Sequence, residues 1–313
     1  MALINTVTGK VDSSKLGTTL VHEHLKVRSE AISMQFPHLY GDDESDFKKV
    51  IKELKEIKDR GVQTICDPTV MELGRDIRFM ERAAREVNMN VIAATGIYTV
   101  HYITPYLQNR SIDFLAELFV RDIEVGIQNT SIKAGFLKAA TDELGFTPDV
   151  IKVLRAVARA HKKTNVPIMV HSHPDSQNGL KQLEIFKEEG VDPRGVLIAH
   201  CGDTDNLDYL IKILDQGAFI GMDRYASGLG VKTEQRNATV AELAKRGYSD
   251  QMFLSHDYNI VFDFFTDEMF QNAPDWSLTY IFDKVLPDLQ ERGVTKEQIK
   301  TIMVDNVRRW VGE

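Results

Sequence analysis

Short apolar runs alternate with longer amphipathic segments along this chain, and this alternation is the main structural signal in the sequence. Eight runs have the length and the β-branched content of strands. They span Thr18 to Leu25, Val62 to Asp67, Asn90 to Tyr98, Ile132 to Ala139, Val166 to His171, Val196 to Cys201, Ala218 to Asp223 and Met252 to Asp257. We therefore expect eight strands separated by connecting segments.

The connecting segments show helical periodicity. Between Asp46 and Asp59 the apolar side chains recur at the spacing of one helix face, and Thr147-Pro148 begins a similar segment that runs to Lys163. Strands joined by helices pair in parallel, and eight of them in this length favour a closed (β/α)8 TIM barrel over an open doubly wound sheet. Because no Gly/Ser-rich linker or charge block interrupts the pattern, we expect residues 1–313 to form one α/β domain.

The composition narrows the possible functions. Of the 313 residues, 43% are hydrophobic and 27% charged, as in ordinary globular proteins. The net charge of −8 opposes nucleic-acid binding, and no apolar stretch approaches the ~18 residues that a membrane helix needs. The first residues lack the apolar core of a signal peptide, so we expect a cytoplasmic protein that binds neither nucleic acid nor membrane. Cys66 and Cys201 are expected to be buried thiols.

The carboxyl ends of the predicted strands carry an unusual set of side chains. In the first run, alternation places His22 and His24 on one face while Glu23 points away from them. Lys138, His171, His200 and Asp257 lie at the ends of the fourth, fifth, sixth and eighth runs. The carboxyl ends of barrel strands surround one mouth, so these side chains should converge there. Imidazole and carboxylate groups in one place indicate a divalent metal site.

Lys138 is not an ordinary metal ligand like the histidines and the aspartate, because an ammonium group repels metal cations. Burial could lower its pKa and make it a Schiff-base nucleophile. Alternatively, its side chain could extend outward to solvent. A third possibility is carboxylation, because a lysine carbamate supplies two oxygens that can bridge two metal ions. The residues by themselves leave all three open.

Six segments carry a resemblance to a known family. They are VHEHL from Val21, GFLKAA from Gly135, the run that ends in His171, AHCGDTDN from Ala199, GMDRY from Gly221 and LSHDY from Leu254. Together they resemble the phosphotriesterase-like lactonases of the amidohydrolase superfamily. The resemblance implies one divalent ion on His22, His24 and Asp257, a second ion on His171 and His200, and a carboxylated Lys138 between them. Zinc suits such ligands best, cobalt, manganese and iron also fit, and the resemblance implies a homodimer.

Two positions indicate which class of substrate the protein prefers. True phosphotriesterases carry Trp where this chain has Tyr98 and His where it has Arg224, so both positions resemble lactonases. A tyrosine hydroxyl can orient a lactone carbonyl, whereas Arg224 either contacts the substrate or is a surface arginine in an ion pair. The neighbouring Asp223 can be interpreted simply as a turn residue. Asn259, where relatives often have Cys, is also expected in the substrate site.

The segment from Ile260 to Phe270 is rich in aromatic side chains. The resemblance places an acyl-chain channel here, so Phe264 and Phe265 are expected to contact the substrate. The alternative is that the aromatics of this segment, with Met269 and Phe270, form one face of a helix packed on the barrel.

These inferences predict a binuclear metallohydrolase that opens lactones, above all the N-acyl-homoserine lactones of quorum quenching, with weak activity on organophosphate triesters. Asp257 is expected to accept the proton during hydrolysis, and Tyr98 to assist at the substrate oxygen. The alternative within the same fold is a dedicated phosphotriesterase. Outside this class stand a Schiff-base lyase that uses Lys138 and a non-catalytic metal-binding barrel.

Overall fold

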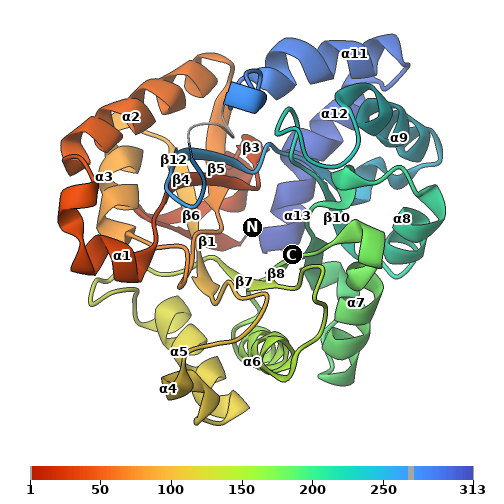
Figure 1. The fold of residues 1–313 in the computed structure, drawn as a ribbon. Helices are drawn as coiled ribbons and strands as arrows, with labels where there is room; N and C mark the ends of the chain where they lie inside the picture. Colours follow the sequence, from red (N-terminus) through yellow and green to blue (C-terminus); the bar gives the residue numbers. More distant parts are fainter. Residues whose placement is uncertain (1, 267–270, 313) are drawn as a thin grey trace.

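Eight parallel strands and the helices between them form a barrel, which the computed structural model describes for residues 2–266 and 271–312 (Figure 1). In chain order the strands are β3 (Thr18–Leu20), β5 (Val62–Asp67), β6 (Asn90–Gly96), β7 (Phe136–Ala140), β8 (Ile168–His171), β9 (Val196–Ile198), β10 (Phe219–Met222) and β11 (Met252–Leu254). Each strand pairs in parallel with the next. The predicted (β/α)8 TIM barrel is therefore confirmed.

The described residues form four further strands outside this order. A hairpin of β1 (Leu3–Thr6) and β2 (Gly9–Asp12) precedes the barrel, and β4 (Glu23–Val27) pairs in parallel with β12 (Tyr258–Phe262). The first predicted run is thus split into β3 and β4. The eighth predicted run is too long, because β11 ends at Leu254 and the unpredicted β12 begins directly after Asp257. Both interruptions fall where predicted metal ligands lie.

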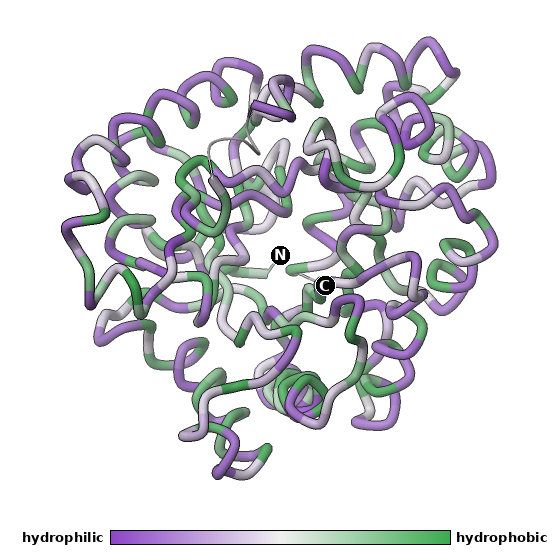
Figure 2. Tube along the Cα trace, in the orientation of Figure 1, coloured by the Kyte–Doolittle hydropathy of each residue, from purple (hydrophilic) through white to green (hydrophobic). Residues whose placement is uncertain are grey.

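Helices surround the strands (Figure 1). They are α1 (Glu30–Gln35), α2 (Asp43–Asp59), α3 (Ile77–Val87), α4 (Pro105–Gln108), α5 (Ile112–Glu124), α6 (Pro148–Thr164), α7 (Asn178–Glu188), α8 (Leu207–Leu214), α9 (Thr233–Lys245), α11 (Leu286–Glu291), α12 (Lys296–Lys300) and α13 (Asn306–Gly312). The side chain of Thr147 caps α6 by accepting from the Val150 N–H, as expected for a threonine before an N-terminal proline. Hydrophobic and hydrophilic positions alternate along these helices, so each can pack one face on the barrel (Figure 2).

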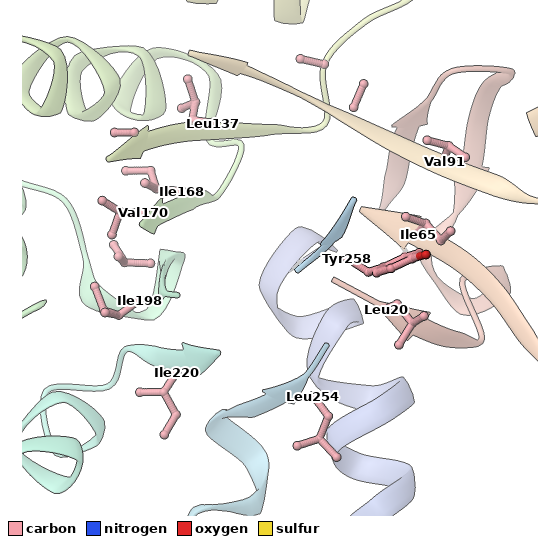
Figure 3. Close-up of a cluster of buried hydrophobic side chains, with 14 of the residues drawn as sticks. Leu20, Ile65, Val91, Leu137, Ile168, Val170, Ile198, Ile220, Leu254 and Tyr258 are labelled. Atoms are coloured by element: carbon pink, nitrogen blue, oxygen red, sulfur yellow. The ribbon is translucent and has the colours of Figure 1, made fainter. Parts of the chain in front are cut away.

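Alternation along the strands builds two hydrophobic layers. One layer, between strands and helices, contains Leu20, Ile65, Leu137, Ile168, Ile198, Ile220 and Leu254 (Figure 3). The adjacent residues Cys66, Phe136, Met169, Leu197, Phe219 and Phe253 fill the barrel interior, together with Trp310 of α13. Each buried aliphatic side chain contributes about 1.5–3 kcal/mol, so strand register is strongly fixed by this pattern. Trp310 packs on Phe136 and Phe253, which fills the barrel at its amino end and leaves the carboxyl end for polar groups.

Both cysteines are buried free thiols, as predicted. Among the described helices, none has the length and apolar character that crossing a membrane requires.

Candidate functional site

A cavity of about 470 Å³ lies over the carboxyl ends of the strands. Its walls include every candidate residue named from the sequence: His22, His24, Tyr98, Lys138, His171, His200, Arg224, Asp257, Asn259, Phe264 and Phe265. They come from segments up to 243 residues apart (265 − 22). The barrel topology brings them together, because most lie at or just beyond the carboxyl end of a strand, while Lys138 lies within β7, His24 within β4 and Asn259 within β12.

Three of the predicted ligands form one group. The Nε2 atoms of His22 and His24 lie 3.2 and 3.3 Å from the same Asp257 Oδ1 atom. Both histidines are buried, and the Asp257 side chain is only 15% exposed. Two nitrogens and one carboxylate oxygen in this arrangement are a donor set that a divalent ion accepts.

His171 and His200 form a second group. The Nδ1 atom of His171 lies 2.7 Å from the Nε2 atom of His200. The other ring nitrogen of each histidine contacts a carboxylate, Asp142 Oδ2 at 3.1 Å from His171 and Asp223 Oδ1 at 2.9 Å from His200. Those contacts place the ring protons on the carboxylate side, so two lone pairs face each other across the short gap. Such a pair needs a proton or a cation between its nitrogens, and this donor set therefore fits a metal ion.

The protonation of the histidines agrees with ligation. Burial lowers the pKa of His22 and lowers that of His171 to about 4, so both rings are neutral near pH 7. Only a neutral imidazole has the lone pair that binds a metal ion. His22 and His24 each also contact an oxygen through Nδ1, from Asp223 and from the Thr69 hydroxyl. In all four histidines, one nitrogen is thus held by a group that is not a predicted ligand, while the other lies beside another predicted ligand.

Lys138 lies inside this cluster rather than reaching solvent. Its side chain is 1% exposed, and Nζ lies 3.4 Å from the His22 Nε2 atom. The interpretation that it extends outward is therefore wrong. Burial lowers the pKa of Lys138 to about 8, which raises the fraction of neutral amine near pH 7. The neighbouring strand approaches closely here, because a Cβ atom on Gly96 would lie 1.9 Å from the Lys138 carbonyl oxygen.

Arg224 makes two largely buried ion pairs, with its side chain 18% exposed, and is not a surface arginine. Its Nε donates to Asp257 Oδ2 at 3.0 Å, and its Nη1 donates to Asp203 Oδ2 at 2.9 Å. Arg224 and Asp257 both have left-handed backbones, with φ of 61° and 51°, which non-glycine residues seldom adopt. The surrounding contacts therefore hold a turn whose geometry aims the guanidinium at Asp257.

Tyr98 lies two residues beyond the end of β6, and its ring packs nearly perpendicular to that of His171, with the two ring centroids 5.4 Å apart. Burial raises the pKa of its hydroxyl, so the phenol stays protonated and can donate a hydrogen bond into the cavity. Asn259 is also buried, and its Nδ2 donates to the Asp257 carbonyl at 3.1 Å.

One side of the cavity is apolar. The Phe262 ring lies 5.5 Å from that of Phe264 and 5.4 Å from that of Phe265, and Phe264 and Phe265 are 39% and 57% exposed. Phe262 ends strand β12, so the helix interpretation is wrong for the described part of this segment. Met269 and Phe270 lie outside the described residues. A second cavity of about 520 Å³ adjoins Phe264 and Phe265.

Sequence reasoning missed several residues that hold the site. Asp223 is not simply a turn residue, because its two oxygens contact His22 and His200, one from each group. The fully buried Arg236 of α9 donates to Asp203 Oδ1 and to the Arg224 carbonyl. Asp223 ends the seventh run, a position that signals a site residue in this fold, whereas Arg236 lies mid-helix and carries no such signal.

Comparison with known proteins agrees with this geometry. A sequence model of the Phosphotriesterase family matches residues 2–311. The chain belongs to the phosphotriesterase family. It is 49% identical over 303 residues to a protein named aryldialkylphosphatase from Saccharolobus solfataricus, covering 96% of both chains. It is also 43% identical over 317 residues to a phosphotriesterase homology protein of Mycobacterium tuberculosis, covering 99% of this chain and 97% of that one.

A solved structure titled as the phosphotriesterase from Mycobacterium tuberculosis has the same fold, with a TM-score of 0.96 and 42% identity over 99% of this chain and 98% of that chain. As a member of the phosphotriesterase family, this protein is a metal-dependent hydrolase. Membership therefore sets aside the Schiff-base lyase and the non-catalytic barrel.

Proposed function

We propose that this protein is a binuclear-metal lactonase that hydrolyses lactones, N-acyl-homoserine lactones above all, with secondary activity on organophosphate triesters. The observation that carries the proposal is the division of the cavity into a polar floor and an aromatic wall. Tyr98 and Arg224 belong to the polar floor, and Phe262, Phe264 and Phe265 form the aromatic wall. A substrate with a cyclic ester head and an apolar tail matches both halves.

His22, His24 and Asp257 would hold one divalent ion, His171 and His200 the other, with zinc the best match to these ligands. When bound, the ions supply Lewis acidity, which polarises an ester carbonyl and lowers the pKa of water. Lys138 would be carboxylated: its neutral amine adds to carbon dioxide and releases one proton. The resulting carbamate replaces a buried positive charge with a negative one, and the location of Nζ beside His22 supports this change.

The remaining steps belong to the side chains. Asp257 accepts the proton of the attacking water and returns it to the alkoxide that leaves when the ester C–O bond breaks. Arg224 orients the Asp257 carboxylate through the 3.0 Å contact, and Asp203 holds Arg224 from the other side. The Tyr98 hydroxyl donates to the substrate oxygen on which negative charge develops.

A dedicated phosphotriesterase is the second candidate. It is favoured by the name of the relative that is 49% identical, an aryldialkylphosphatase. The two candidates differ in whether a lactone or an organophosphate triester is the better substrate of the same site. The Tyr98 ring packed beside His171 and the pairing of Arg224 with Asp257 support the lactonase.

The experiment that separates them measures kcat/KM on metal-reconstituted enzyme for acyl-homoserine lactones, aliphatic lactones and paraoxon. We expect at least one lactone to exceed paraoxon, because the floor supplies Tyr98 as a donor to the ester oxygen. Higher kcat/KM for paraoxon than for every lactone would return the assignment to phosphotriesterase.

The aromatic wall predicts a chain-length effect. Each further methylene buried on the wall adds about 0.8 kcal/mol, so kcat/KM should rise along an acyl series until the wall is covered. Phe264→Ser or Phe265→Ser should flatten this rise, with Leu144→Ser, an exposed apolar residue elsewhere, as the matched control. If chain length has no effect in the unaltered enzyme, the acyl-homoserine part of the proposal fails.

The two ligand groups also predict metal content. The purified protein should hold about two divalent ions per chain, and His22→Ala combined with His171→Ala should lose both, because each substitution removes a ligand from a different group. Elemental analysis with a matching activity assay tests this. One ion per chain in fully active enzyme would contradict the binuclear proposal.

The homodimer also stays a prediction, which light scattering can check.

A further inference from the structure

The first and last strands of the barrel meet at an irregular seam. β3 and β11 are the two ends of the sheet order, and β4 pairs with β12 one step further along. Between these pairs, side-chain contacts and a backbone hydrogen bond join the two segments. The Ser255 hydroxyl accepts from the N–H groups of Val21 at 2.9 Å and His22 at 3.1 Å, while the Asp257 N–H donates to the His22 carbonyl at 3.0 Å.

Glu23 is the central side chain of this seam. It is fully buried, although it stands between the two histidines of the first group and faces away from them. Its Oε1 atom accepts from the His256 N–H and from the His256 Nδ1 atom, both at 2.8 Å. Its Oε2 atom accepts from the Tyr258 N–H at 3.0 Å. The carboxylate therefore holds the residue before Asp257 and the residue after it.

His256 extends this contact toward the substrate cavity. Because its Nδ1 donates to Glu23, its Nε2 is free to accept, and the Ile281 N–H donates to it at 3.1 Å. The carbonyl of His256 accepts from Trp276 Nε1 at 3.0 Å, and Trp276 lines the cavity. The buried Glu23–His256 pair thus contacts both the turn of Asp257 and one wall of the cavity.

We propose that Glu23 and His256 form a clamp that positions Asp257 for metal binding. Asp257 has a left-handed backbone that extended pairing would not allow, so something other than a sheet ladder must fix it. Three hydrogen bonds to one buried carboxylate do this from both sides. Glu23, the middle residue of the His22-Glu23-His24 motif, then belongs to the metal site together with the two histidines.

This inference rests on the proposed metal group of His22, His24 and Asp257, and the test separates the two. Metal-free protein is titrated with Co²⁺ in bicarbonate buffer, and binding is followed by the visible absorption of the ion. The variants are Glu23→Gln, Asp257→Asn and Asn306→Ser. Asn306 is the matched control, because it is fully buried and donates to the Ser249 and Met252 carbonyls beside the opposite end of β11.

Glu23→Gln keeps the size of the side chain but turns one amide NH₂ toward a backbone N–H of the Asp257 turn. We expect it to weaken Co²⁺ binding about 10- to 100-fold and to change the absorption spectrum of the bound ion. Asn306→Ser should lower the melting temperature of the metal-free protein while Co²⁺ affinity stays within about twofold of the unaltered protein. The clamp is supported if Co²⁺ affinity changes in Glu23→Gln and not in Asn306→Ser.

The other outcomes overturn it. If Asp257→Asn binds Co²⁺ like the unaltered protein, the proposed metal group fails and the clamp fails with it. If Asp257→Asn weakens binding and Glu23→Gln does not, only the clamp fails. If Glu23→Gln and Asn306→Ser lose affinity in proportion to their loss of melting temperature, Glu23 is merely structural.

A second pair keeps the test decisive where Glu23→Gln does not fold. His256→Gln retains an acceptor at the position of Nε2 but loses the donor to Glu23, and His256→Asn does the reverse. The clamp predicts that His256→Gln weakens Co²⁺ binding more than His256→Asn. Equal affinities in the two variants would contradict it.

Discussion

Lys138→Ala should lose both divalent ions and about three or more orders of magnitude in kcat/KM, the largest effect we expect from one substitution. Carboxylated Lys138 would be the one group that both ligand sets share, since Nζ lies 3.4 Å from His22 and the cavity also holds His171 and His200. Without it, two cations would face each other with no anion between them. Elemental analysis and kcat/KM for the best lactone measure the two losses.

Added short carboxylates provide the control for this prediction. Acetate or propionate can enter the space that the lysine leaves and supply the missing oxygens, so metal content and activity should be partly restored in Lys138→Ala. The same salts should have no such effect on Asp257→Asn, where the missing oxygens belong to a different side chain. A bare amine in the active metal-loaded enzyme, observed by ¹³C NMR after labelling with bicarbonate, would contradict carboxylation.

Most of the barrel could be predicted because its strands carry their own pattern. In β5 the bounds agree with the prediction, Val62–Asp67, since the run is continuous and, from Thr64 onward, buried on both faces. The first and eighth runs were predicted too long. There the chain leaves the sheet near His22 and Asp257, and the φ of 51° at Asp257 is one that an extended strand does not allow.

The cavity-facing residues could be predicted for the same topological reason. A residue that ends a barrel strand has a known destination, so His171 could be assigned from position and chemistry alone, whereas the assignment of Lys138 needed the family resemblance. Their supporting partners could not. Arg236 contacts Asp203 across 33 residues, and Glu23 contacts His256 across 233, and neither spacing follows from local periodicity. Hydrogen-bond partners of this kind depend on loop geometry, which the alternation of apolar positions does not encode.

Asp223→Asn should impair both metal groups although Asp223 is not among the predicted ligands. Its Oδ1 accepts from the N–H and Nδ1 of His200, and its Oδ2 lies 2.9 Å from His22 Nδ1. Asparagine offers one oxygen, which the two donors of His200 will hold. The NH₂ group then faces His22 Nδ1, so the ring proton of His22 must move to Nε2, where it occupies the lone pair that a metal ion needs.

We expect metal affinity and kcat each to fall about 10- to 100-fold, the scale found when the hydrogen-bond partner of a metal-binding histidine is removed. Three measurements test this prediction. Metal content is measured after gel filtration, kcat is measured with the best lactone, and the ¹⁵N NMR shifts of the His22 ring in metal-free protein report which ring nitrogen carries the proton. Thr69→Val is the matched comparison: it removes the partner of His24 Nδ1 without imposing a tautomer, so its effect should be smaller. If Asp223→Asn keeps both ions and the Nδ1 proton of His22, a carboxylate at this position serves only to fill space.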